Sequence, residues 1–302
     1  MSRNDLAVIT CHFNWTGFKR PVQNLHRFLR QMAVDGIPVY GAEASLTDQF
    51  QTANNPNWKQ IKCTQNNICF QHYSLLNIAE TLVPEQYTKI IYCDADLFFA
   101  NKNWYEESSE ALDKYNLIQP FTYCHWTTIT GTIDKKARSI LTVPVTETLL
   151  KSKFWTGPEP LHTGFAWGAK RELWKKGIKL YPYNFLGGGD LVSLGAVCNP
   201  EITNLSLSYA YMRTSATAFY TNWKQKFYHY VNHKTGVIQG DVYHEYHGDR
   251  QNRQYDSRCK IVHNSNFDVS TVYLNENGLI TIDSPDILNA IKLYFLNRKE
   301  DS

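Results

Sequence analysis

Two acidic residues one position apart, Asp94 and Asp96, directly follow the apolar run Lys89–Cys93. Alternate residues of an extended chain point to the same side, so a slight bend lets both carboxylates reach one hard divalent cation. A cation held in this way bridges the phosphate oxygens of a bound nucleotide. A solvated turn is the alternative, which the apolar neighbours disfavour because idle carboxylates in a dry environment cost free energy. The pair therefore predicts a metal and phosphate site.

A third acid follows a run of glycines. Gly187, Gly188 and Gly189 precede Asp190, which opens the apolar helical segment Leu191–Val197. Glycines let the backbone approach a ligand closely, and a helix N-terminus stabilises a carboxylate as the anion. Asp190 could equally serve as an N-cap after a flexible turn, so position alone does not decide between the two roles.

Two histidines, His244 and His247, lie three residues apart between a predicted strand and Gly248. A pair at this spacing suggests metal ligands more strongly than a lone histidine does. Zinc is an alternative, but the histidines have no companion cysteines at zinc-ligand spacing. An oxygen ligand such as Asp96 suits Mn²⁺ or Mg²⁺.

Three arginines follow the histidines on a predicted helix: Arg250, Arg253 and Arg258. They are either solvated charges or groups that neutralise a diphosphate, since the guanidinium fork fits phosphate oxygens.

Strand and helix patterns alternate around these residues. Apolar runs predict strands at Leu6–Cys11, Ile37–Tyr40, Lys89–Cys93, Leu117–Pro120 and Val237–Tyr246. Helical spacing of apolar residues predicts helices at Pro21–Val34, Tyr73–Leu82, Trp104–Tyr115 and Ile287–Phe295, and we expect the aromatic-rich segment Tyr209–Asn232 to be partly helical. The order indicates an α/β fold that opens with parallel strands, and Asp94 then lies where open α/β sheets bind ligands.

Composition sets wide limits. The chain has 302 residues, enough for one large domain, and a net charge of +3 that neither requires nor excludes a polyanionic partner. Seven dispersed cysteines fit free thiols in a reducing compartment. We see no signal peptide and no apolar run of the roughly 20 residues that cross a bilayer. We therefore expect a cytoplasmic protein without a transmembrane segment.

Two of the motifs resemble a known family. The segment Asp94–Phe99 is similar to the DxD motif of glycosyltransferases of the GT-A fold. The Gly-Phe-Ala-Trp segment that begins at Gly164, followed by the glycine run and Asp190, looks like the acceptor-binding region of inverting enzymes of the beta-1,4-galactosyltransferase-like and family 2-like groups. Phosphatases of the HAD type also carry a DxD, but after their first strand and usually with Thr or Val where Phe98 stands.

The resemblance implies a GT-A, Rossmann-like mixed central sheet flanked by helices in a single domain over residues 1–302. Residues 1–120 would form the nucleotide-binding half, residues 121–265 the acceptor and metal-completing half, and residues 266–302 a C-terminal extension. The implied activity is metal-dependent transfer of a sugar from a nucleoside diphosphate, with UDP as the commonest donor nucleotide, to a hydroxyl group. Inversion is favoured, and a retaining course stays open.

The same resemblance implies roles for individual residues. Asp190 would be the general base. The family often has Gly-Glu-Asp-Asp where this chain has Gly-Asp-Leu, so the roles of base and of acceptor-orienting group fall on one acid or are shared with residues elsewhere. Mn²⁺ or Mg²⁺ would be held by Asp96, His247, His244 and Asp94, with Asp94 assigned more readily to the ribose or a metal-bound water. The expected donor-binding residues are Thr10, His12, Asn14, Arg20, Gln71, Asp94, Ala95, Arg250 and Arg253, and the expected acceptor-binding residues are Gly164, Trp167, Gly188 and Gly189.

The sequence leaves the acceptor open. Trp126, Trp155 and Trp167 could stack on a sugar of a glycan. The compact chain also resembles phage-encoded glycosyltransferases, some of which modify hydroxymethylated pyrimidines in DNA, and Lys135, Lys136, Arg138, Lys151 and Lys153 could contact phosphates or simply face solvent. A non-catalytic nucleotide-sugar-binding protein is a further alternative. The donor sugar and the oligomeric state also stay open.

Overall fold

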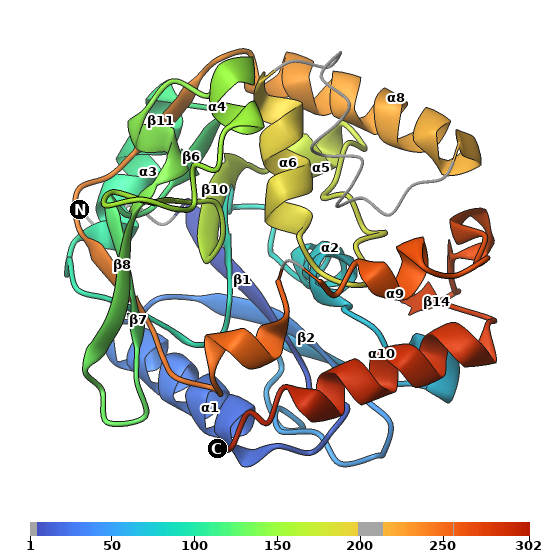
Figure 1. Ribbon diagram of the computed structural model, residues 1–302. Coiled ribbons are helices and arrows are strands. Elements are labelled where there is room, and N and C mark those ends of the chain that lie inside the picture. Colours follow the sequence, from blue (N-terminus) through green and yellow to red (C-terminus); the bar gives the residue numbers. More distant parts are fainter. Residues whose placement is uncertain (1–4, 199–213, 256) are drawn as a thin grey trace.

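A mixed β-sheet forms the centre of the molecule (Figure 1). The computed structural model describes residues 5–198, 214–255 and 257–302, and within them the sheet has seven strands in the order β11-β6-β10-β4-β1-β2-β3. These strands are β1 (Leu6–Phe13), β2 (Val39–Ser45), β3 (Trp58–Lys62), β4 (Lys89–Cys93), β6 (Leu117–Gln119), β10 (Ala166–Lys170) and β11 (Thr235–Val237). The strands β4, β1, β2 and β3 are parallel, whereas β10 is antiparallel to β4 and β6. The predicted mixed α/β fold is confirmed.

Helices cover both faces of this sheet. In β1, Leu6 and Val8 pack with α1 (Lys19–Val34) and α3 (Trp104–Lys114), while Ala7 and Ile9 pack with α2 (His72–Glu80) on the opposite face. All four side chains are fully buried. Burial on both faces explains why the strand reads as a continuous apolar run and not as an alternating one. The predicted helices at Pro21–Val34, Tyr73–Leu82 and Trp104–Tyr115 are confirmed to within two residues at each end.

A second, five-stranded sheet begins with the strand that follows β4 in the chain. It has the order β5-β12-β7-β8-β9, and its strands are β5 (Leu97–Phe99), β7 (Tyr123–Thr127), β8 (Ile133–Ser139), β9 (Leu161–His162) and β12 (Asp241–His244). Only three residues, Asp94 to Asp96, separate β4 of the first sheet from β5 of the second. The acidic pair therefore lies at the passage between two sheets, and not in a loop that leads to a helix.

The glycine-rich loop leads into a helical layer. Helix α6 (Gly189–Cys198) packs against α8 (Thr214–Val231), and the short helices α4 (Glu147–Lys151) and α5 (Glu172–Lys175) lie in the same part of the chain. Val192, Leu194 and Tyr220 join the core on the α2 side of the central sheet. The predicted segment Tyr209–Asn232 corresponds to α8 from Thr214 onward, and its first five residues lie outside the described residues.

Residues 257–302 close one end of the cavity described below. They contain α9 (Lys260–His263), the hairpin of β13 (Tyr273–Leu274) and β14 (Ile280–Thr281), and α10 (Pro285–Asn297), which confirms the predicted helix at Ile287–Phe295. Four short 3₁₀ segments complete the described chain: η1 (Gln65–Asn67), η2 (Ile140–Thr142), η3 (Arg250–Arg253) and η4 (Val269–Thr271). Isoleucines of β14 and α10 form a separate apolar cluster with Phe185 and Leu186 of the glycine-rich loop.

Two elements are shorter than the sequence predicts. The strand expected over Val237–Tyr246 is divided into β11 and β12, which belong to different sheets, because a turn at Gly240 (φ 138°) interrupts it. The helix expected to carry all three arginines is only the short segment η3, which ends at Gln254 in a left-handed conformation. Arg258 is therefore not on the same helical face as Arg250.

The described part of the chain contains no helix that is both long and apolar enough for a membrane span. The cysteines with described side chains are free thiols, of which Cys11, Cys63, Cys69, Cys93 and Cys124 are buried.

We predict that Gly168→Ala destabilises the protein by about 1–3 kcal/mol, the usual cost of overpacking a core. An added Cβ would lie 2.6 Å from Ile91 Cδ1 and 2.8 Å from Ile118 Cγ1, on the two strands that flank β10. Urea unfolding measures the change. Glu276→Ala, on an exposed turn, is the control, and an unchanged Gly168→Ala midpoint would contradict this packing.

Candidate active site

Three side chains converge at the start of the second sheet. Asp96 Oδ2 lies 3.0 Å from His247 Nε2 and 3.5 Å from His244 Nε2, and the two ring nitrogens are 3.3 Å apart. Two atoms that each bind one cation at about 2.1 Å are about 3.0 Å apart at a right angle and about 3.4 Å apart at a tetrahedral angle. The three distances therefore match the edges of the coordination shell of a single ion.

The chemistry of these groups also fits a divalent cation. Burial lowers the pKa of His244 to about 3, so its imidazole is neutral and offers a lone pair. Burial raises the pKa of the Asp96 carboxyl, but His244, His247 and Arg253 lower it by more, and the group is ionised. Asp96 Oδ1 is buried and has no hydrogen-bond partner among the described residues, as expected for a ligand that awaits a cation. Two nitrogens and one carboxylate thus form a group that could hold one metal ion.

Strand pairing brings these ligands together. Strands β5 and β12 are antiparallel, and their register places His244 opposite Leu97, the residue after Asp96. The next backbone N–H, that of Glu245, donates to the carbonyl oxygen of Asp96 at 2.9 Å. Gly248 then turns the chain with φ 90°, and a Cβ at this position would lie 2.9 Å from the backbone oxygen of Arg298. The glycine after His247 is therefore needed both for its conformation and for space.

Asp94 is not part of the metal cluster. Its Oδ1 lies 3.1 Å from Nε2 of His72, the first residue of α2, and about a third of its side chain is exposed. Burial raises the pKa of the Asp94 carboxyl, and Asp96 and Asp190 add to this effect, whereas His72 opposes it. The two acids of the predicted pair thus face different partners. No sequence motif points to His72, because a single histidine at a helix start is common in any chain.

A cavity of about 440 Å³ lies in front of both acids. Most of the predicted site residues line it: His12, Asp94, Ala95, Asp96, Gly164, Trp167, Gly188, Gly189, Asp190, His244, His247, Arg250 and Arg253. Segments that are far apart in the chain are thereby brought to one place, since the lining residues range from Cys11 to Arg298.

Four predicted donor-binding residues do not line this cavity. Thr10 and Gln71 are fully buried, and each donates a hydrogen bond to a backbone carbonyl oxygen, at 2.8 Å in both cases. The amide of Asn14 donates to the backbone oxygen of Phe18 at 2.6 Å. Arg20 lines a second, smaller hollow instead. The contacts seen for Thr10, Asn14 and Gln71 are those of residues that shape the surrounding loops.

Asp190 faces the cavity from the first turn of α6. One of its carboxylate oxygens, Oδ2, accepts a hydrogen bond from the hydroxyl of Thr163. Gly187 and Gly188 have φ of 85° and 83°, so the turn before the helix uses the left-handed region that favours glycine. At Gly189 an added Cβ would lie 2.7 Å from the ring of Tyr73. The glycine run thus sets the position of Asp190 through both turn geometry and close packing.

His162 is a cavity residue that sequence reasoning missed. Its Nε2 is buried and without a hydrogen-bond partner in the described chain, and its ring contacts those of Trp126 and Phe165. Burial lowers the pKa of His162 to about 4. A Cβ on Gly164 would lie 3.1 Å from His162 Nε2 and 3.4 Å from Asp190 Oδ2, so this glycine leaves open the space between the two groups.

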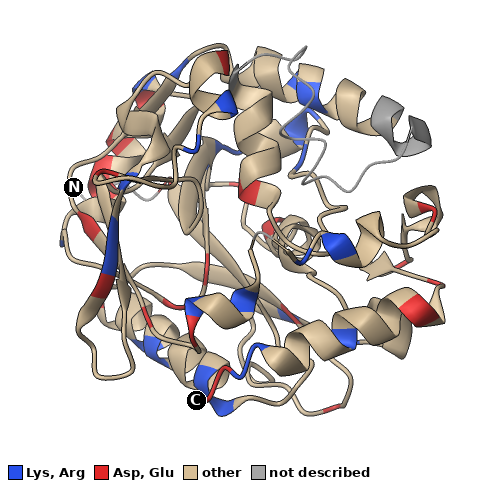
Figure 2. Ribbon diagram, viewed as in Figure 1, with Lys and Arg blue, Asp and Glu red and all other residues tan. Residues whose placement is uncertain are grey.

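Buried arginines line the cavity beside the metal cluster. Arg253, Arg258 and Arg298 are each only 8% exposed. The guanidinium groups of Arg258 and Arg298 both lie 5.4 Å from the ring centre of Phe70. Arg250 is more exposed and pairs with Asp134 of β8 at 2.9 Å. Figure 2 shows that both basic and acidic residues occur along α10 and the segment that follows it.

The chain matches no protein-family model and no curated protein. Among solved structures, the catalytic domain of Drosophila beta-1,4-galactosyltransferase 7 in complex with xylobiose is 14% identical over 63% of this chain, with a TM-score of 0.31. A mutant of that enzyme with manganese, UDP-Gal and xylobiose is 15% identical over the same share, with a TM-score of 0.31. The chain covers 58% of each of these two structures.

A third structure is a glycosyltransferase involved in the glycosylation of the major capsid of PBCV-1. It is 9% identical, with 86% of this chain and 99% of that chain covered and a TM-score of 0.33. Values this low do not define a function, so the function is inferred below from the residues of the cavity.

We predict that Asp96→Asn weakens Mn²⁺ binding at least 100-fold, because it removes the only charged ligand of the cluster. Titration calorimetry without any nucleotide measures the affinity. Asp94→Asn is the matched control and should change it less than 5-fold, since Asp94 faces His72. Equal losses in the two variants would contradict this division of the acidic pair.

Proposed function

We propose that the protein is a metal-dependent glycosyltransferase that moves a sugar from a nucleoside diphosphate, with UDP as the expected nucleotide, to a hydroxyl group. One observation carries the proposal. A single cavity holds a cluster of three metal-ligand side chains and, separately, a carboxylate held at a helix start by Thr163. The first group suits a leaving diphosphate, and the second suits an attacking hydroxyl. The motifs of the sequence resemble the same class of enzyme.

The metal cluster and the arginines form the donor end. A bound divalent cation compensates the charge that develops on the departing diphosphate. Asp96, His244 and His247 would hold this ion, and Arg253 lies close enough to affect the charge of Asp96. Arg253 is buried and its Nε has no partner in the described chain, so its guanidinium can donate to phosphate oxygens at the cavity wall.

Mn²⁺ is the ion that we expect. Mg²⁺ prefers oxygen ligands in a near-ideal octahedron, whereas two of the three groups here are imidazoles. Imidazole favours transition-metal ions, and the carboxylate of Asp96 keeps the site suitable for a hard one.

Asp190 and its surroundings form the acceptor end. The hydroxyl of Thr163 orients one oxygen of Asp190 and leaves the other available to take the proton of an acceptor hydroxyl. Attack from this side, opposite the diphosphate, inverts the anomeric centre. The buried indole N–H of Trp167 donates to the backbone oxygen of Thr163 at 2.7 Å and so helps to hold Thr163 beside Asp190. Trp126 and Trp155 line the cavity and provide aromatic surface for a sugar ring.

The basic residues on β8 have local partners. Lys136 Nζ lies 3.9 Å from the ring centre of Tyr123, Lys135 Nζ lies 5.2 Å from that of Trp126, and Arg138 pairs with Glu159 at 3.2 Å. These contacts give no separate support to a DNA acceptor, and a carbohydrate hydroxyl is the acceptor that we propose.

The proposal is tested by incubating the protein with a panel of UDP, GDP and CDP sugars, with Mn²⁺ and without it. We expect metal-dependent release of the nucleoside diphosphate from one donor, and loss of this release in Asp96→Ala. Donor binding without turnover under every condition, with sugar acceptors present, would instead identify a non-catalytic binding protein.

We predict that Asp190→Asn lowers kcat for transfer by about 10²–10⁴-fold, the usual contribution of a general base. Donor and metal affinities should stay within 3-fold, because Asp190 does not belong to the metal cluster. Steady-state kinetics and calorimetry measure the two effects. Asp286→Asn removes an acid from the first turn of α10 and serves as the control, and normal transfer by Asp190→Asn would exclude the assigned role.

A further inference from the structure

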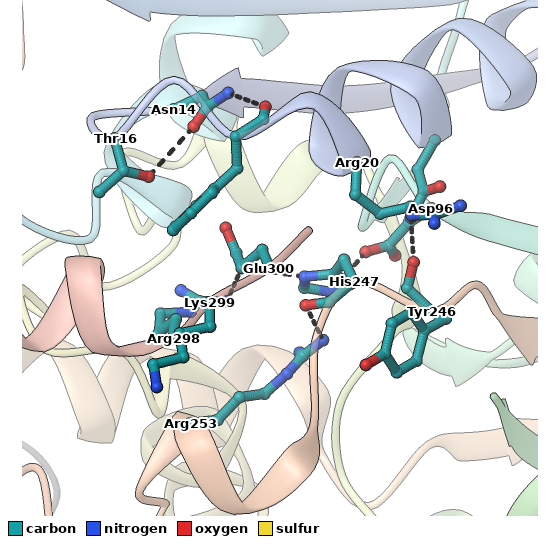
Figure 3. Close-up of polar contacts among 12 residues, drawn as sticks. Asn14, Thr16, Arg20, Asp96, Tyr246, His247, Arg253, Arg298, Lys299 and Glu300 are labelled. Atoms are coloured by element: carbon teal, nitrogen blue, oxygen red, sulfur yellow. Dashed lines mark hydrogen bonds and ion pairs between the residues drawn. The ribbon is translucent and has the colours of Figure 1, made fainter. Parts of the chain in front are cut away.

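Residues 298–302 return from α10 to the metal cluster (Figure 3). Glu300 Oε1 lies 3.0 Å from Nδ1 of His247, the ring nitrogen that does not face Asp96. Glu300 is 8% exposed, and Arg298 pairs with the same carboxylate oxygen at 2.6 Å. The carboxylate is therefore buried between a cation and a histidine that we assign to the metal.

This contact selects one form of the imidazole. A carboxylate can only accept, so the proton of neutral His247 lies on Nδ1 and its lone pair on Nε2. Nε2 is the atom that lies 3.0 Å from Asp96 Oδ2. The guanidinium of Arg298, 2.6 Å from the same carboxylate oxygen, compensates the charge of Glu300 in this buried position.

The same segment is held at several other points. The carboxylate of Asp301 accepts hydrogen bonds from the backbone N–H groups of Lys19 and Arg20, at 3.0 and 2.7 Å, where α1 begins. The hydroxyl of Tyr246 donates to the backbone oxygen of Ser302. Gly248 packs directly against the backbone of Arg298, Lys299 and Glu300, so the turn that carries His247 lies on this segment.

We propose that residues 298–301 act as a positioning strap for the metal site, with Glu300 fixing the orientation and tautomer of His247. The strap rests on the metal site of the proposed function, which it extends by a residue that does not itself touch the ion. A carboxylate behind a ligating histidine holds the ring in place and makes it a stronger ligand. The contacts of Asp301 with α1 and of Arg298 with Glu300 hold the Glu300 carboxylate beside Nδ1 of His247.

The test is titration of the full chain with Mn²⁺ alone, followed by calorimetry. Glu300→Gln keeps the size of the side chain and removes its charge, and we expect Mn²⁺ affinity to fall by about 10–100-fold, as for other partners of metal ligands. Glu300→Asp should regain part of the loss. Glu276→Gln makes the same charge change on an exposed turn and should bind Mn²⁺ as the unchanged chain does.

Thermal unfolding without metal separates positioning from folding. Similar Tm values with weakened Mn²⁺ binding in Glu300→Gln support the strap. A lower Tm with unchanged Mn²⁺ affinity overturns it, and so does unchanged affinity at an unchanged Tm. Should Glu300→Gln fail to fold, Asp301→Asn gives the second measurement: it detaches the segment from α1 and should weaken Mn²⁺ binding, and full affinity in this variant overturns the strap.

Asp96→Asn in the same titration distinguishes the two proposals. Loss of binding in Asp96→Asn with normal binding in Glu300→Gln rejects the strap and keeps the metal site. Normal binding in both variants rejects the metal site itself.

Discussion

The buried charge of Asp96, whose side chain is only 16% exposed, is the interaction on which the rest of the site depends. Burying the charge of Asp96 without compensation is expensive, and the fold meets that demand with groups from distant parts of the chain. His244 at the end of β12 and His247 in the turn after it face this carboxylate, and Arg253 adds positive charge. The pairing of β5 with β12 is therefore both a structural and an electrostatic necessity. Without it, Asp96 would lack both of its histidine partners.

The first half of the fold follows directly from sequence pattern. Strands β1 and β4 are apolar on both faces, and α1, α2 and α3 have clear apolar stripes, so local composition is enough to place them. Short strands behave differently. Strands β5, β9 and β11 have two or three residues each, and no periodicity can be read from so few. In the second sheet β5 pairs with β12 and β9 with β8, and in the first sheet β11 pairs with β6; local pattern does not encode these pairings.

The candidate site likewise contains residues that sequence motifs identify and residues that they do not. Spacing singled out Asp96, His244 and His247 as candidate metal ligands, and the resemblance supplied the role of Asp190 that position alone left open. His72, His162 and Glu300 carry no such motif. Their places depend on tertiary packing: a helix start beside Asp94, a glycine that leaves room beside Asp190, and a segment that returns to the turn at Gly248. The resemblance assigned Thr10 and Gln71 to the donor, yet their polar groups donate hydrogen bonds to backbone carbonyl oxygens.

Strand β10 has a consequence for how the cavity can change. It runs antiparallel beside β4, Ala166 pairs with Cys93, and the N–H of Asp94 donates to the carbonyl oxygen of Phe165. The acidic pair and the segment that contains Thr163 are thus joined by one ladder of backbone hydrogen bonds. The register of β10 on β4 sets the backbone position of Phe165 relative to Asp94, and substitutions that keep this register leave that position unchanged. Substitution of the aromatic residues around this ladder would change which molecule fits the cavity. The backbone spacing between Asp94 and Phe165 would stay constant.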